Sequence, residues 1–255
     1  MTERAKGAAW QGAHYDSVSD PQFGWGTEIL SRLGDVGAGA VLDAGCGSGR
    51  VTEVLCSTHT QAVVAALDVS ASMLEQARRR LSRFGPRISY VLGDLSGELA
   101  ELAAIAPFEA IVSTGTLHWV NDHAALYRRL FDVLVPGGSF VAQCGGEGSI
   151  HAVRLALDEL GIEWRGFNRY AGAAESARWL TDAGFCDVWT WLSSEPVEFD
   201  EQEALVDYLL GGVLAPYIAH CQADEQRRIA EAIVGRLESR VLEFVRLNVL
   251  ARRPR

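Results

Sequence analysis

The amino-acid sequence predicts an α/β protein built on a doubly wound, mostly parallel β-sheet. Apolar runs of strand length alternate with helical stretches from about residue 27 to residue 145, which is typical of parallel strands joined by crossover helices. The predicted strands end in acids or glycines, at the edge where such sheets bind ligands. With 255 residues, the chain is long enough for one large domain with an added cap.

The first predicted strand is the most informative element. A helix over residues 27–33 precedes it, and the segment from Val41 to Gly49 reads VLDAGCGSG, a buried strand that passes through Asp43 into three alternate glycines. Such a turn brings backbone N–H groups close to a nucleotide-type cofactor. A nicotinamide fingerprint would have its third glycine at position 50, where this chain has Arg50. The pattern therefore disfavours NAD.

The following elements continue the alternation. A helix is expected over 49–57 and a strand over 62–68, and Ser70 can cap a helix whose apolar face holds Met73, Leu74 and Ala77. The other expected strands cover residues 88–94, 108–115, 139–146, 183–193 and part of 241–255. The other expected helices cover residues 97–105, 122–134, 150–161, 173–183 and much of 201–239.

Composition excludes several classes of protein. The formal net charge is −10, which opposes a phosphate backbone, so nucleic acid is not expected as a partner. The N-terminus lacks an apolar export segment and no apolar run reaches about 18 residues, so we expect a cytoplasmic protein without membrane insertion. The five cysteines are scattered without a CxxC pair and are expected to be reduced thiols rather than zinc ligands: Cys46, Cys56, Cys144, Cys186 and Cys221.

Three segments resemble one family. The glycine turn resembles motif I of the class I S-adenosylmethionine (SAM) dependent methyltransferases. Residues 113–120, STGTLHWV, resemble the SNxxLHW stretch of its trans-aconitate methyltransferase-like subgroup, with Thr114 in place of the commoner Asn. Residues 204–218 resemble the cap helix of that subgroup, but Ala215 replaces an arginine, and the loop before the last strand is shorter. Recognition of a polycarboxylate therefore does not follow.

The resemblance implies a Rossmann-like sheet of seven strands in which the last strand is antiparallel and lies beside the sixth. The helices between those two strands would form a substrate cap. We divide the single domain into an N-terminal lid (1–34), a SAM-binding core (35–148) and cap elements with the last strands (149–255). Trp10, Tyr15 and Trp25 resemble the lead segment that folds over the cofactor in this subgroup.

The resemblance also implies site residues. Asp68 would accept the ribose hydroxyls, Met73 would pack on the adenine, and Asp94 would hold the adenine amino group. The full expected set for SAM is Asp43, Gly45, Cys46, Gly47, Gly49, Asp68, Val69, Met73, Asp94, Leu95, Ser113 and Thr114. For the acceptor the expected residues are Trp119, Tyr170 and Tyr217, with His118 as a base or a packing residue and Tyr15 as an orienting hydroxyl.

The predicted reaction is methyl transfer from SAM to a small, largely apolar molecule, with S-adenosylhomocysteine as product and no need for a metal. Eight aromatic residues of the expected cap region favour such an acceptor: Trp164, Phe167, Tyr170, Trp179, Trp189, Trp191, Tyr208 and Tyr217. O-methylation of a carboxylate or hydroxyl is the first expectation. C-methylation, or SAM binding without transfer, stays open, and so does the choice between monomer and homodimer.

Overall fold

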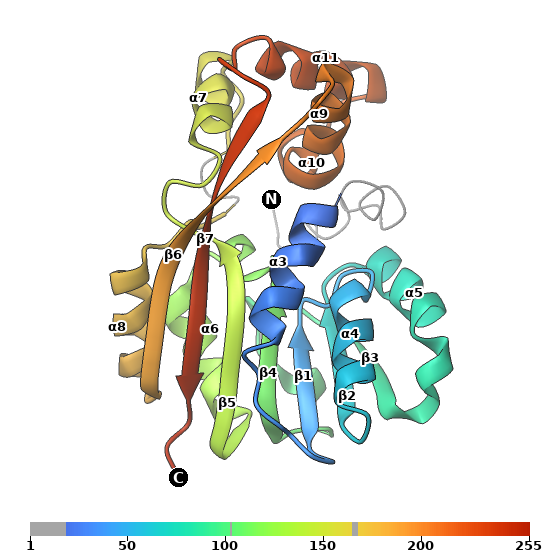
Figure 1. Cartoon of the computed structure of the whole chain (residues 1–255), viewed down its shortest axis with the longest axis vertical. Helices are drawn as coiled ribbons and strands as arrows, with labels where there is room; N and C mark the ends of the chain where they lie inside the picture. The colour runs from blue at the N-terminus through green and yellow to red at the C-terminus, as the bar shows by residue number, and fades with distance from the viewer. Residues whose placement is uncertain (1–18, 103, 165–167) are drawn as a thin grey trace.

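A computed structural model describes residues 19–102, 104–164 and 168–255. It contains a seven-stranded sheet of order β3-β2-β1-β4-β5-β7-β6, in which β7 runs antiparallel to both β5 and β6 (Figure 1). The predicted doubly wound sheet with a reversed last strand is therefore confirmed. The strands are β1 (Ala40–Ala44), β2 (Val63–Asp68), β3 (Ile88–Leu92), β4 (Phe108–Thr114), β5 (Leu134–Gly145), β6 (Cys186–Glu198) and β7 (Val241–Arg252).

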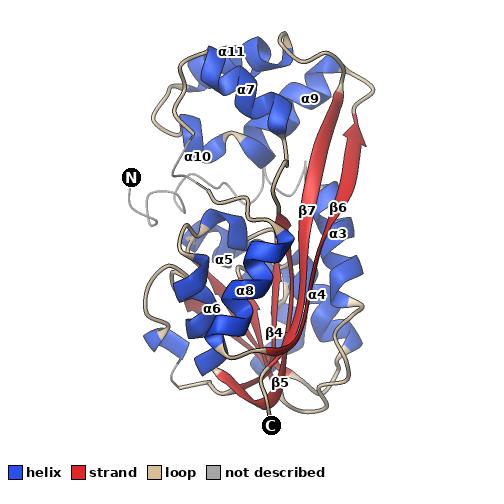
Figure 2. Cartoon of the chain, turned by 90° about the vertical axis from the view of Figure 1, so that its left-hand side faces the viewer, coloured by secondary structure: helices blue, strands red, loops and turns tan. Residues whose placement is uncertain are grey.

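Helices cover both faces of the sheet. Successive residues of β1 point to opposite faces of the sheet. Leu42 packs in the same apolar cluster as α6 (His123–Asp132) and α8 (Ala173–Ala183), whereas Val41 packs with the helices that cover the opposite face. Those helices are α3 (Asp20–Leu30), α4 (Arg50–Thr58) and α5 (Ala71–Arg80). Figure 2 shows α6 and α8 on the other side of the strands from α3 and α4.

The cap is a separate apolar cluster above the carboxyl ends of the central strands (Figure 1). It consists of α7 (His151–Glu159), α9 (Gln202–Tyr208), a π-helical turn over Leu209–Val213, α10 (Ala215–Ile218) and α11 (Ala223–Val234). The long strands β6 and β7 stay paired from Cys186 and Arg252 up to Glu198 and Val241, so they carry the cap away from the sheet.

Several expected boundaries were wrong. The first helix begins at Asp20 with Pro21 in its first turn, where a missing N–H costs nothing, and not at residue 27. The helix expected over 97–105 is reduced to one 3-10 turn over Ala100–Leu102, because Asp94 holds the N–H groups of Ser96 and Gly97 in a turn. Among the described residues, no helix has the length and apolar content of a membrane span.

Residues 135–138, which separate the helix predicted over 122–134 from the strand predicted over 139–146, lie inside the fifth strand. β5 begins at Leu134 and includes Pro136 and Gly137, whose φ of 82° gives an irregular register against β4. The N–H of Gly137 donates to backbone oxygens of the C-terminal segment, so the sequence pattern of a turn marks a bulge here.

Candidate active site

The glycine turn after β1 requires glycine at each predicted position. Gly45, Gly47 and Gly49 have φ values of 90°, 54° and 84°, which side-chain-bearing residues rarely adopt. A Cβ on Gly45 would lie 2.2 Å from the Thr116 Oγ1, whereas a Cβ on Gly47 would meet no atom within 4 Å. The turn is thus packed against the segment that follows β4 on one side and open to a cavity on the other.

Asp68 ends β2 at the wall of this cavity. Its Oδ2 accepts the N–H of Gly47 and its Oδ1 the N–H of Ser70, each at 2.8 Å. Burial raises the pKa of the carboxyl, and the backbone N–H donors oppose that rise. The two bonds fix the carboxylate beside the glycine turn, with lone pairs left for hydroxyls of a ligand.

Asp43 lies beneath the turn and does not line the cavity. It is 1% exposed, its Oδ2 accepts the Thr52 hydroxyl at 2.6 Å, and its Oδ1 has no hydrogen-bond partner among the described residues. Burial, with Asp68 nearby, raises its pKa to about 6, and the Thr52 hydrogen bond limits the rise. A buried carboxylate with one unsatisfied oxygen favours a cationic ligand above it.

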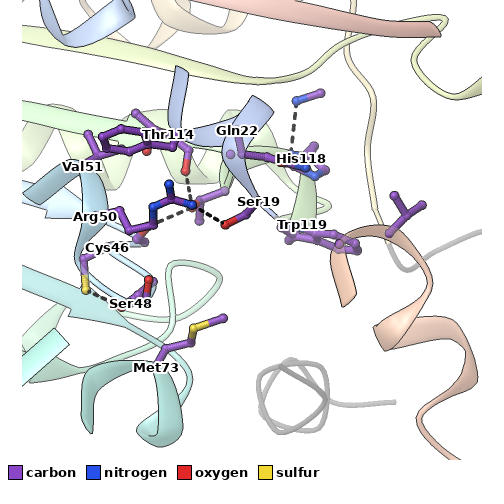
Figure 3. A pocket seen from close by; sticks show the side chains of 18 of the residues that line it. Ser19, Gln22, Cys46, Ser48, Arg50, Val51, Met73, Thr114, His118 and Trp119 are labelled. Carbon is purple, nitrogen blue, oxygen red and sulfur yellow. Dashed lines mark hydrogen bonds between the residues drawn. The ribbon is translucent and has the colours of Figure 1, made fainter. Parts of the chain in front are cut away.

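The cavity joins the glycine turn to the underside of the cap. Of the predicted residues, Figure 3 labels Cys46, Met73, Thr114, His118 and Trp119 around it. The cavity is also lined by the predicted Gly45, Gly47, Asp68, Val69 and Tyr170, and by residues that the sequence analysis did not single out, among them Ser19, Gln22, Phe23, Val51, Thr116, Gly145, Ile150, Val213, Phe244 and Arg246.

His118 lies on a 3-10 turn, Leu117–Trp119, just after β4. Its Nδ1 accepts the N–H of Gly145 at 3.2 Å (Figure 3), and its ring stacks on Tyr170 at 5.5 Å between centroids and 15° between planes. Burial, followed by the charges of Arg246 and His123, lowers its pKa well below 6.5. The imidazole is therefore neutral at physiological pH.

The tyrosine hydroxyls form a small network behind His118. Asn168 Nδ2 donates to Tyr170 Oη at 3.2 Å and to Tyr217 Oη. Burial raises the pKa of Tyr170 to about 12 and that of Tyr217 well above 10, so both hydroxyls stay protonated. Tyr217 packs against Trp119 at 6.3 Å and does not itself line the cavity.

Arg246 on β7 is the main residue that sequence reasoning missed. It is 4% exposed, lines the cavity, donates from Nε to Gln143 Oε1 at 3.3 Å, and lies 4.5 Å over the ring of Trp25. The available signal was a single arginine among the mostly apolar residues 244–250, because a charge on a buried strand usually has a function or a partner.

Arg50, the first residue of α4, also lines the cavity. Its guanidinium contacts Ser19 at 3.2 Å and Asp20 at 2.6 Å, and it lies 4.5 Å over the ring of Phe23. It thereby ties α3 to the start of α4, next to the glycine turn. Position 50 thus holds an arginine that joins two helices beside the cavity, where a dinucleotide fingerprint would have glycine.

Other predicted residues do not line the cavity. Asp94 caps the turn after β3, the Leu95 carbonyl accepts Arg129, and the Ser113 hydroxyl donates to the Ala44 carbonyl. Gly49 precedes α4. Trp10, Tyr15 and Phe167 lie outside the described residues.

The eight aromatic residues do not form one cluster. Trp179 and Trp191 pack on opposite faces of the sheet, and Trp189 is 71% exposed. Trp179 belongs to the amphipathic helix α8, and Trp189 and Trp191 belong to the edge strand β6, so none of these three is part of the cap. In the part of the chain that the structure describes, no group of three or more His, Cys, Asp or Glu side chains is arranged to hold a metal ion.

The reversed β7 between β5 and β6 sets this sheet apart from a simple dinucleotide-binding one. Together with the glycine turn and Asp68, it defines the class of SAM-dependent methyltransferases. Comparisons agree: the family described as "Methyltransferase domain" matches residues 41–138.

The chain resembles the trans-aconitate 2-methyltransferase of Methylobacterium nodulans, with 30% identity over 97% of this chain and 100% of that one. The protein of the same name from Deinococcus radiodurans is 26% identical over 96% and 98%. The fold of this chain resembles that of Haemonchus contortus phosphoethanolamine N-methyltransferase 2 in complex with SAM. The TM-score is 0.62 and the identity 18%, with coverage of 96% of this chain and 57% of that one. The chain belongs to the SAM-dependent methyltransferase family that includes the trans-aconitate 2-methyltransferases.

Proposed function

We propose that this methyltransferase forms a methyl ester on a carboxylate of a small, largely apolar molecule. The observation that carries the proposal is Arg246, a buried cation in the wall of a cavity that is otherwise mostly apolar. A guanidinium in such a setting favours a carboxylate, which its planar array of donors matches. The net charge of −10 supports a small acceptor over nucleic acid.

The residues at the other end of the cavity fit SAM. The open side of Gly47 leaves room for the ligand, the fixed carboxylate of Asp68 can accept ribose hydroxyls, and the unsatisfied oxygen of Asp43 favours a cation above the turn. When bound, SAM supplies a methyl group on a sulfonium sulfur, a reaction that requires no metal. This chain's residues would contribute by holding the acceptor in line and excluding water.

The relatives are named for trans-aconitate, a carboxylate, which supports the acceptor class. Their subgroup's cap motif has an arginine where this chain has Ala215, at the start of α10. The loss of that cation supports an acceptor with fewer carboxylates and more apolar surface. Phe23, Ile150, Val213 and Phe244 line the cavity and suit such an acceptor.

Matched acceptors test this proposal. The release of S-adenosylhomocysteine would be measured with apolar monocarboxylic acids, with their carboxamides, and with di- and tricarboxylic acids. The monocarboxylates are expected to have the highest kcat/KM and the carboxamides none that is measurable. Turnover of phenols or of activated carbon acids, with no turnover of any carboxylate, would contradict the proposal.

A further inference from the structure

We infer that His118 is a hydrogen-bond donor that positions the acceptor, with its Nε2–H directed to a carboxylate oxygen, and that it does not act as a base. The inference deepens the proposed function and rests on it for the identity of the acceptor. Its geometric part, the position of the proton on the ring, is independent of the acceptor.

The backbone of β5 determines which ring nitrogen carries the proton. The N–H of Gly145 points at His118 Nδ1 from 3.2 Å. An amide N–H can only donate, so Nδ1 must present its lone pair. A neutral imidazole carries one proton, which is therefore on Nε2.

Packing holds the ring in this orientation. The ring of His118 stacks on Tyr170, and the ring of Trp119 also contacts it, with 4.8 Å between the two ring centroids. A Cβ on Gly145 would lie 2.5 Å from Tyr170 Cε1 and 3.4 Å from His118 Cγ, so only glycine allows this approach of strand and rings. A flipped ring would set a C–H against the Gly145 N–H and lose the hydrogen bond.

The Nε2–H is available to a ligand. His118 lines the cavity, and its Nε2 makes no hydrogen bond within the described part of the chain. Nor is Nε2 one of the side-chain nitrogen and oxygen atoms of the described residues that are both shielded from solvent and without a hydrogen-bond partner. Nε2 is therefore reached from the cavity, where a ligand oxygen can accept its proton in a hydrogen bond.

The surroundings oppose a second proton on the ring. Burial lowers the pKa of His118, and two neighbouring charges lower it further. They are those of Arg246 on β7, which pairs in register with Gly145 on β5, and of His123 on α6. The other titratable groups packed around His118, Cys144 and Tyr170, have raised pKa values and are neutral. To act as a base, Nε2 would need the proton moved to Nδ1, against the Gly145 N–H.

A carboxylate acceptor needs no base, which agrees with this tautomer. Its oxygen lone pair forms the new O–CH3 bond while the electrons of the CH3–S bond go to sulfur, so the products are the ester and the neutral thioether, and no proton is released. The Nε2–H and the Arg246 guanidinium both line the cavity that would hold this carboxylate. His118 is thus a donor suited to an acceptor that is already ionised.

Amide substitutions separate the two roles. Glutamine can place an amide N–H near the position of Nε2, whereas asparagine is one methylene shorter and its amide falls near Nδ1; neither is a base. His118→Ala and His118→Asn should raise the KM for the acceptor about 10- to 100-fold, the range for losing a hydrogen bond to a charged oxygen, with smaller changes in kcat. His118→Gln should recover most of that loss. An equal fall of kcat in all three variants would overturn the inference and indicate a base.

Nitrogen-15 NMR of histidine-labelled protein tests the proton position without any turnover. The chain has six histidines, and the signals of His118 are those missing from the His118→Gln spectrum. The expected result at pH 7 is a neutral ring protonated on Nε2; a proton on Nδ1 or an imidazolium would refute it. If the NMR shows Nε2–H and no carboxylate is methylated, the acceptor class is wrong and the tautomer stands.

Discussion

Replacing Asp43 by Asn should stabilise the ligand-free protein in a pH-dependent way. Burial raises the carboxyl pKa from its ordinary value of 3.8 to about 6, so the folded state holds the proton more tightly than the unfolded chain does. Stability is therefore lost as the pH rises from about 4 to about 6. At about 1.4 kcal/mol for each pH unit, the full cost is about 3 kcal/mol, of which about 2 kcal/mol falls between pH 4.5 and pH 7.5.

Urea unfolding at pH 4.5 and pH 7.5 measures this effect. The free energy of unfolding of Asp43→Asn minus that of the wild type should increase by about 2 kcal/mol between the two pH values. Thr52→Val is the companion variant, because removing the hydroxyl that donates to Asp43 should raise the pKa further and widen the wild-type pH dependence. A difference between Asp43→Asn and the wild type that does not vary with pH would refute the account of a buried, costly carboxylate.

Three other substitutions test the site. Asp68→Asn should weaken S-adenosylhomocysteine binding in calorimetry by about 1–3 kcal/mol, since ribose hydroxyls lose a charged acceptor; unchanged affinity would remove Asp68 from the cofactor site. Arg246→Gln should raise the acceptor KM about 10- to 100-fold and change S-adenosylhomocysteine affinity little, and the reverse pattern would place the cation at the cofactor. Gly145→Ala should displace Tyr170 and raise the acceptor KM, whereas kinetics like those of the wild type would show that the close approach of strand and ring is not needed.

The sequence predicted the sheet because its signals are local. Each central strand is an apolar run. Glycine is needed at positions 45, 47 and 49 because all three residues have positive φ, and the alternate glycines are visible in the sequence. The reversed β7 was predicted only through family resemblance, since periodicity does not report strand direction. The prediction of a helix over 97–105 was wrong because hydrogen bonding by the Asp94 side chain competes with helix formation.

The site was predicted in part. Asp68 at the end of β2 follows from the topology, because carboxyl ends of parallel strands meet at one edge. His118 was singled out only through the resemblance of residues 113–120 to a family motif. Arg246 was missed because it enters the cavity only through the pairing of β5 with β7, a contact with Gly145 about 100 positions earlier in the chain. The tautomer of His118 depends on the N–H of Gly145, at the end of β5 and 27 positions further along the chain, so no local pattern could reveal it.

The most direct test of the central claim is the chemical form of the transferred methyl group. The enzyme would be incubated with methyl-labelled SAM and the best monocarboxylate, and the product treated with mild alkali. We expect the label to be released as methanol, because a methyl ester hydrolyses. Label that stays on the product through this treatment would show an ether, amine or carbon–methyl bond and contradict carboxylate methylation.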